Sequence, residues 1–138
     1  MLLLAANASP VPREEPTIDS LKARISSANV NDKPHLCVQV AQLQLHEVDK
    51  LYASGNLEQA QAALTDVVAY SELARDYSIQ AHKYQKQSEI AVRGMTRKLT
   101  DILHTLAQPD QAAIKDAVHR LDRVRDDLLA SMFKKGGK

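Results

Sequence analysis

The sequence predicts an all-α protein, an elongated helical bundle of the coiled-coil type built on one long central helix. Three observations support this fold class. Helix breakers are scarce, since Gly94 is the only glycine between residues 56 and 108 and no proline lies there. Apolar residues recur at spacings of three and four along most of the chain. Aromatic residues make up only 4% of the sequence, so an aliphatic core is expected.

The first 16 residues differ in composition from the rest. Ala6 and Ala8 form the small-x-small pair of a signal peptidase site, preceded by a Leu/Ala run. The run has no basic flank and is shorter than the usual ~7–15 apolar residues, so a plain apolar N-terminus is the alternative. We interpret residues 1–16 as a signal-peptide remnant and proline-rich linker, which predicts a periplasmic or secreted protein of a bacterial envelope. The alternative predicts a cytoplasmic protein.

Residues 17–138 are predicted to form a single helical domain. Its first helix is expected over residues 17–28, with an apolar face that consists of Ile18, Leu21 and Ile25. A second helix is expected over residues 32–54, since Gly55 then ends it.

The central helix is predicted over residues 57–106. Heptad positions keep one phase across this range: Leu57, Leu64, Ser71, Ser78, Gln85, Val92, Leu99 and Leu106 at a, and Ala60, Val67, Ala74, Ala81, Ser88, Met95 and Ile102 at d. Such a run predicts one continuous helix roughly 75 Å long. Gly94 is the expected place for a bend, but the phase is kept around it, so we predict continuity there.

A last helix is predicted over residues 110–133. Because short connections make neighbouring helices antiparallel, the helix over residues 32–54 should cover the first half of the central helix, and the last helix its second half. Two-helix hairpins leave an apolar stripe uncovered. We therefore predict a protein partner, either a second copy in a homodimer or another helical protein.

The middle of the central helix is small and polar, and three tyrosines flank it at intervals of seven residues. We predict a possible interaction surface here that consists of Tyr70, Tyr77, Tyr84, Ala74, Ser78 and Ala81. Small side chains allow another backbone to approach closely. The alternative use of the same small residues is a cavity for a small ligand.

Two Asp-x-x-His steps suggest a metal site, because carboxylate and histidine pairs on facing helices can bind metals. They are Asp101 with His104 and Asp116 with His119. All four lie at c or f heptad positions, which predicts that they face solvent. No catalytic triad or glycine-rich phosphate loop occurs, and there is one cysteine. We predict no catalytic, cofactor-binding or metal-binding residue, and no enzyme.

The tyrosine row lies among lysines and arginines, an arrangement that can bind single-stranded nucleic acid. Acidic residues alternate with these cations, and Glu89 with Arg93 forms an i,i+4 pair typical of a solvated face. Because the net charge is only +1, we predict no nucleic-acid partner. No segment approaches the ~20 apolar residues of a membrane span, so none is predicted. Cys37 lies in a predicted helix, where we expect a buried apolar residue.

Residues 55–60, Gly-Asn-Leu-Glu-Gln-Ala, together with Leu64 resemble the turn and second helix of a tetratricopeptide repeat. The first helix departs from that pattern at Gln44 and Val48, and no second copy follows at the period of such repeats. We interpret the segment as a generic helical hairpin turn. The sequence thus predicts a non-enzymatic helical interaction or scaffolding protein, and a small-ligand-binding helical bundle is the alternative.

Overall fold

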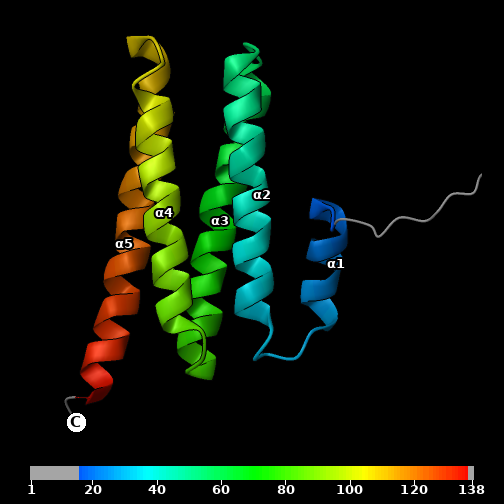
Figure 1. Cartoon of the computed structure of the whole chain (residues 1–138), viewed down its shortest axis with the longest axis vertical. Coiled ribbons are helices and arrows are strands. Elements are labelled where there is room, and N and C mark those ends of the chain that lie inside the picture. Colours follow the sequence, from blue (N-terminus) through cyan, green and yellow to red (C-terminus); the bar gives the residue numbers. More distant parts are fainter. Residues whose placement is uncertain (1–15, 137–138) are drawn as a thin grey trace, which may run out of the picture.

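Five α-helices and one 3₁₀ turn make up residues 16–136, the part of the chain that the structure, a computed structural model, describes (Figure 1). The elements are α1 (Ile18–Ser27), α2 (Lys33–Ala53), α3 (Leu57–Ala81), α4 (Gln85–Leu103), η2 (Gln108–Asp110) and α5 (Gln111–Gly136). No strand occurs in these residues. The predicted all-α helical bundle is confirmed. The predicted signal-peptide remnant lies outside the described residues.

The first helix, α1, begins with a capping box. Thr17 Oγ1 accepts the backbone N–H of Ser20 at 3.0 Å, and Ser20 Oγ accepts the N–H of Thr17 at 3.1 Å. These bonds satisfy two backbone donors that the start of a helix leaves unpaired. Lys22 Nζ then reaches Asp66 Oδ2 of α3 at 2.7 Å. The helix is thereby held against the α2–α3 hairpin (Figure 1).

The α2–α3 hairpin follows the predicted boundaries closely. Pro34 lies in the first turn of α2, where its missing N–H removes no intrahelical hydrogen bond. Gly55 connects the two helices with a φ of 81°, a conformation that a Cβ atom would disfavour.

The predicted continuous helix over residues 57–106 is wrong. Helix α3 ends at Ala81 and α4 begins at Gln85. Between them the chain turns through two left-handed residues, His82 with φ 54° and Tyr84 with φ 66°, although neither is glycine. The central helix is therefore two antiparallel helices, and the predicted elongated shape is corrected to two hairpins side by side (Figure 1).

Hydrogen bonding and apolar burial explain this turn. The N–H of His82 donates to the carbonyl of Ile79, and the N–H of Lys83 to the carbonyl of Ser78, which is the bonding pattern of a Schellman helix ending. A left-handed non-glycine residue costs about 1–2 kcal/mol. Each large apolar side chain that becomes fully buried contributes about 1.5–3 kcal/mol. Folding back buries several such side chains, so it outweighs the strain of the turn.

Helices α2, α3, α4 and α5 form a four-helix bundle (Figure 1). Each hairpin, α2–α3 and α4–α5, is antiparallel, as predicted. Between the hairpins the parallel helices are neighbours, since α5 packs on α3 and α4 on α2. Arg120 Nη2 lies 3.0 Å from Glu72 Oε1, and Lys98 Nζ lies 3.1 Å from Asp49 Oδ2. Although consecutive, α3 and α4 contact each other least of these neighbouring pairs.

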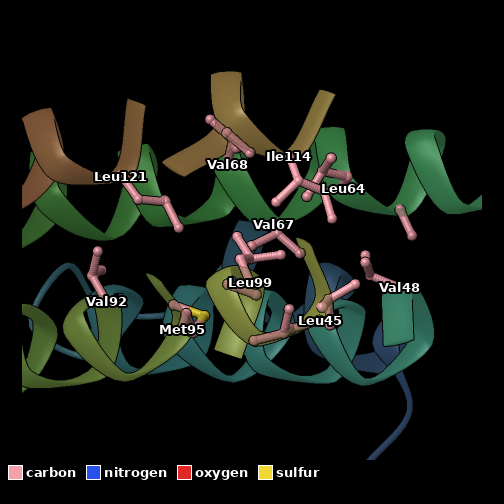
Figure 2. Packing of buried hydrophobic residues seen from close by; sticks show 14 of the residues in the cluster. Leu45, Val48, Leu64, Val67, Val68, Val92, Met95, Leu99, Ile114 and Leu121 are labelled. Carbon is pink, nitrogen blue, oxygen red and sulfur yellow. The ribbon is translucent and has the colours of Figure 1, made fainter. Parts of the chain in front are cut away.

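The main core lies between the two hairpins. All four bundle helices contribute fully or nearly fully buried aliphatic side chains to it, among them Val48, Leu64, Val67, Leu99, Ile114 and Leu121 (Figure 2). A second core lies beside the bundle, where α1 covers α2 and α3, and consists of Leu21, Ile25, Leu36, Cys37, Val38, Val40 and Ala74.

Two predictions about single residues are confirmed. Helix α4 is continuous through Gly94. Cys37 is fully buried, and its burial raises the pKa of the thiol to about 12. Among the described helices, none has the length and apolarity to cross a membrane.

Candidate interaction site

Two of the three tyrosines predicted to form an interaction surface are covered by lysines of the same chain. Lys22 Nζ lies 5.3 Å from the ring centroid of Tyr70, and Lys33 Nζ lies 5.3 Å from that of Tyr77. These distances are those of cation–π contacts. Both rings are half-buried and pack on the second core. They thus help α1 and α2 to cover α3.

The third tyrosine, Tyr84, connects the α3–α4 turn to the start of α2. Its hydroxyl lies 2.8 Å from His35 Nδ1, and the two rings meet edge to face with centroids 5.3 Å apart. Burial raises the pKa of the Tyr84 hydroxyl. The contact holds the turn against the first turn of α2.

The small residues of the predicted surface point into the bundle. Ala74 and Ser78 are fully buried and Ala81 is half-buried. Ser78 Oγ lies 2.9 Å from Ser88 Oγ of α4. The two helices therefore touch at the place where the alternative prediction put a cavity for a small ligand. The six predicted residues therefore do not form one exposed surface.

A buried carboxylate lies at the interface of α4 and α5. Glu89 is only 4% exposed, and its carboxylate accepts hydrogen bonds from Arg93 at 2.6 Å and from Arg125 at 3.1 Å. The bond from Arg93 lowers the pKa of Glu89, and the bond from Arg125 adds to this, against the opposite effect of burial. The sequence-based interpretation of Glu89 and Arg93 as a solvated pair is therefore wrong for Glu89, because its carboxylate is buried.

The two Asp-x-x-His steps face solvent, as predicted. Asp101, His104, Asp116 and His119 are all exposed. In residues 16–136, no three His, Cys, Asp or Glu side chains gather in a way that could hold a metal ion.

The best candidate for a binding site is an apolar groove between α2 and α4, of about 470 Å³. Its lining consists of Gln42, Leu45, Ile90, Ala91, Gly94 and Met95. Ile90 is 50% exposed, more than any other large aliphatic side chain among the described residues. A Cβ atom at Gly94 would have no neighbour within 4 Å. Another backbone can therefore approach α4 closely at this position.

The two edges of this groove differ in charge. On α4, Lys86 and Arg97 are exposed and have no carboxylate within ion-pair distance among the described residues, whereas Arg93 between them is paired with Glu89. On α2, the lining residues are the neutral Gln42 and the apolar Leu45. The groove thus has an apolar floor, and Lys86 and Arg97 lie beside it on the exposed face of α4.

Sequence reasoning missed this groove, although one signal was present. Ile90 lies at an f position of the heptad, on the outer side of α4, where an apolar residue has no partner within its own hairpin. The groove itself is formed by residues of α2 and α4 that are about fifty positions apart, so its existence depends on how the two hairpins pack together.

Comparison of the chain with protein-family models, with curated proteins and with solved structures finds no significant match.

Proposed function

We propose that this protein is a non-enzymatic helical interaction protein that binds an amphipathic helix of a partner protein in the α2–α4 groove. The observation that carries the proposal is the half-exposed Ile90 beside the open, Cβ-free surface of Gly94. A helix that lies in an apolar groove buries residues at spacings of three and four, and a glycine in the groove floor allows close contact between the backbones.

The charge of the groove edge supports an acidic partner. Lys86, Ile90 and Arg97 follow one stripe along α4 that spans roughly 16 Å at 1.5 Å per residue. A partner helix with a leucine-rich stripe and glutamates along one flank would place apolar groups on Ile90 and carboxylates beside the unpaired cations. Such complementarity raises the association rate and sets the orientation of the partner.

A pair of designed peptides tests the proposal. The first peptide carries leucine at every third or fourth position with flanking glutamates, and the second has lysine in place of each glutamate. We expect the acidic peptide to bind, with an affinity that falls as salt is added, and the basic peptide to bind weakly or not at all. Fluorescence anisotropy measures the affinity, and amide shifts in NMR spectra locate the bound peptide. Equal affinity for both peptides, or shifts confined to other helices, would contradict the proposal.

Three variants identify the occupant of the groove. Ile90→Ser should weaken binding of the acidic peptide by about tenfold or more, the effect of losing a central apolar anchor. The matched control is Phe133→Ser, which removes another exposed apolar side chain, 74% exposed on α5, and should leave binding unchanged. Lys86→Glu with Arg97→Glu should reverse the preference towards the basic peptide. If Ile90→Ser abolishes a dimer of the free protein instead, the occupant is a second copy.

The predicted self-association rested on an apolar stripe that each two-helix hairpin leaves uncovered. In the bundle the two hairpins cover each other's stripes. A homodimer therefore needs a different physical basis.

Export to the bacterial envelope is a second part of the proposal, and the Ala6-x-Ala8 pattern after a Leu/Ala run supports it. Expression of the natural open reading frame in a bacterium, followed by mass spectrometry of the periplasmic fraction, tests it. We expect a mature chain that begins at Ser9. An intact chain confined to the cytoplasm would contradict export.

A further inference from the structure

The turn between α3 and α4 is strained. His82 and Tyr84 both adopt positive φ, at 54° and 66°, a conformation that residues with a Cβ rarely take. No glycine or proline occurs in the turn to favour it. In an α-helix the same two residues would have no such strain. The closed turn thus stores energy that a straight helix would release.

The inward faces of α3 and α4 stay in register when the turn is straightened. Inward-facing residues continue across the turn at spacings of three and four: the buried Ala74 and Ser78, the half-buried Ala81, and the buried Gln85 and Ser88. A straight helix through residues 82–84 would therefore present both buried faces on one side. The sequence is compatible with both forms.

Straightening the turn keeps the contacts within each hairpin, α2 with α3 and α4 with α5. Helix α4 packs mainly on α5, and α3 mainly on α2, whereas α3 and α4 touch little. The contacts that would be lost lie between the hairpins, such as Glu72 with Arg120 and Arg75 with Asp127, at 3.0 and 3.2 Å. A second copy that opens in the same way supplies each of these partners.

We propose that two copies of this chain exchange their α4–α5 hairpins. In the resulting dimer, α3 and α4 form one continuous helix, and the α2–α3 hairpin of each copy packs against the α4–α5 hairpin of the other. Every contact between hairpins is remade across the two chains, and the two left-handed residues become helical. A short, strained connection is the usual origin of such exchange.

One contact opposes the exchange. The hydroxyl of Tyr84 lies 2.8 Å from His35 Nδ1 and holds the turn to α2 in the closed chain. At a given protein concentration, the balance between this bond and the strain at His82 and Tyr84 decides how much of each form is populated. The side chain of His82 is exposed, so it can be replaced without disturbing either core.

Two variants at His82 form a matched pair for the first test. Both His82→Gly and His82→Ala remove the imidazole, and they differ by one methyl group. Glycine accepts the positive φ of the closed turn and weakens a helix, whereas alanine is strained in the turn and favours a helix. After refolding at high protein concentration, we expect more dimer for His82→Ala and less for His82→Gly than for the natural chain. Their dimer dissociation constants should differ by more than about tenfold. Light scattering after gel filtration measures both.

A cross-linking experiment separates hairpin exchange from surface association. Chains with Glu72→Cys and chains with Arg120→Cys are mixed, unfolded, refolded together and treated with a short thiol cross-linker. The native Cys37 is fully buried and should not react. Exchange places residue 72 of one chain beside residue 120 of the other, so we expect a covalent product that joins these two positions. Mixing the same chains without unfolding should give none.

Three results would overturn the proposal. The first is that the natural chain and both His82 variants remain monomeric after refolding at high concentration. The second is a dimer that lacks the link between positions 72 and 120. The third is an equal amount of dimer for His82→Gly and His82→Ala.

Discussion

The inward faces of α3 and α4 differ between the two ends of the bundle. Far from the turn that joins them, both helices bury large aliphatic side chains: Leu64, Val67 and Val68 in α3, and Met95, Leu99 and Ile102 in α4. Near the turn, Val92 is the aliphatic exception, and the other buried side chains of the same helices are small or polar: Ser71, Ala74, Ser78, Gln85, Ser88 and Glu89. At the far end, α3 and α4 thus form an ordinary aliphatic core. At the near end they contribute several hydrogen-bonding groups, and the fully buried aliphatic side chains there include Val124 and Leu128 of α5.

This difference shows how stability and specificity are divided along the bundle. Aliphatic contacts at the far end are non-directional, so they stabilise the fold without selecting one pairing of the helices. At the near end, the hydrogen bond between Ser78 and Ser88 and the bond that Gln85 donates to Ser131 require one relative position of the helices. Further apolar burial lies at the side of the bundle, where α1 covers α2 and α3.

The largest expected effect is at the far end. Leu99 is fully buried in the main core, and Leu99→Ala should lower the free energy of unfolding by about 2–5 kcal/mol, because it removes apolar contacts and leaves a cavity. Leu57→Ala is the matched control, since Leu57 also occupies heptad position a but is 38% exposed. Urea denaturation measures both variants. Similar losses for the two would mean that the far end is not the main source of stability.

At the near end, the buried Glu89 should make stability depend on pH. Its pKa in the fold is below the ordinary value of 4.5, so its contribution is fully present above that value and is lost as the pH falls through the folded pKa. Glu89→Gln should destabilise the protein by about 1.5–3 kcal/mol at neutral pH, the range for hydrogen bonds to charged groups. The variant should also lose less stability on acidification than the natural chain. Thermal unfolding between neutral pH and pH values below 4.5 tests this, with the exposed Asp101→Asn as control.

A pair of glycine substitutions tests positions outside the buried parts of both the far end and the near end. Gly94→Ala should raise the free energy of unfolding by up to about 1 kcal/mol, because alanine favours the helix and its methyl group meets no atom within 4 Å. Gly55→Ala also has open space, but its φ of 81° should make the change destabilising. Opposite signs in melting temperature are expected. A loss of stability for Gly94→Ala would show that α4 does not continue through that residue.

The smallest effect is expected for Ser71→Ala. The Ser71 hydroxyl is buried and forms no hydrogen bond, so its removal should change stability by less than about 0.5 kcal/mol or increase it slightly. Ser88→Ala loses the bond to Ser78 and should cost about 1 kcal/mol. Equal values in urea denaturation would show that the hydrogen bonds of the near end do not contribute to stability.

The fold class and most helix boundaries could be predicted from the sequence because their signals are local. Pro34 and Gly55 mark the ends of α2, and apolar spacing identifies the buried faces. The turn at residues 82–84 could not be predicted in this way. It has no glycine or proline, and a heptad phase records which side of a helix is buried but not which neighbour covers it. A hairpin and a straight helix therefore share the same pattern here.

The buried polar residues near the turn could not be predicted either, and nor could the groove. Both depend on how the two hairpins pack together. Glu89 lies beside the heptad seam, a position that is at the edge in a two-helix hairpin and inside a four-helix bundle. Ile90 was visible as an apolar residue on an outer face, but Leu45 became its neighbour only when α2 and α4 packed together.

The burial of Cys37 makes this residue a natural reporter of opening motions. The thiol lies under α1 with no exposed surface, and its high pKa leaves very little thiolate at neutral pH. A thiol reagent can therefore react only in the rare moments when α1 moves away from α2 and α3. The rate of modification then measures how often the first helix detaches, in the same way that slow amide exchange measures local unfolding. Since the chain has no other cysteine, a single kinetic trace reports on this one helix without any engineered label.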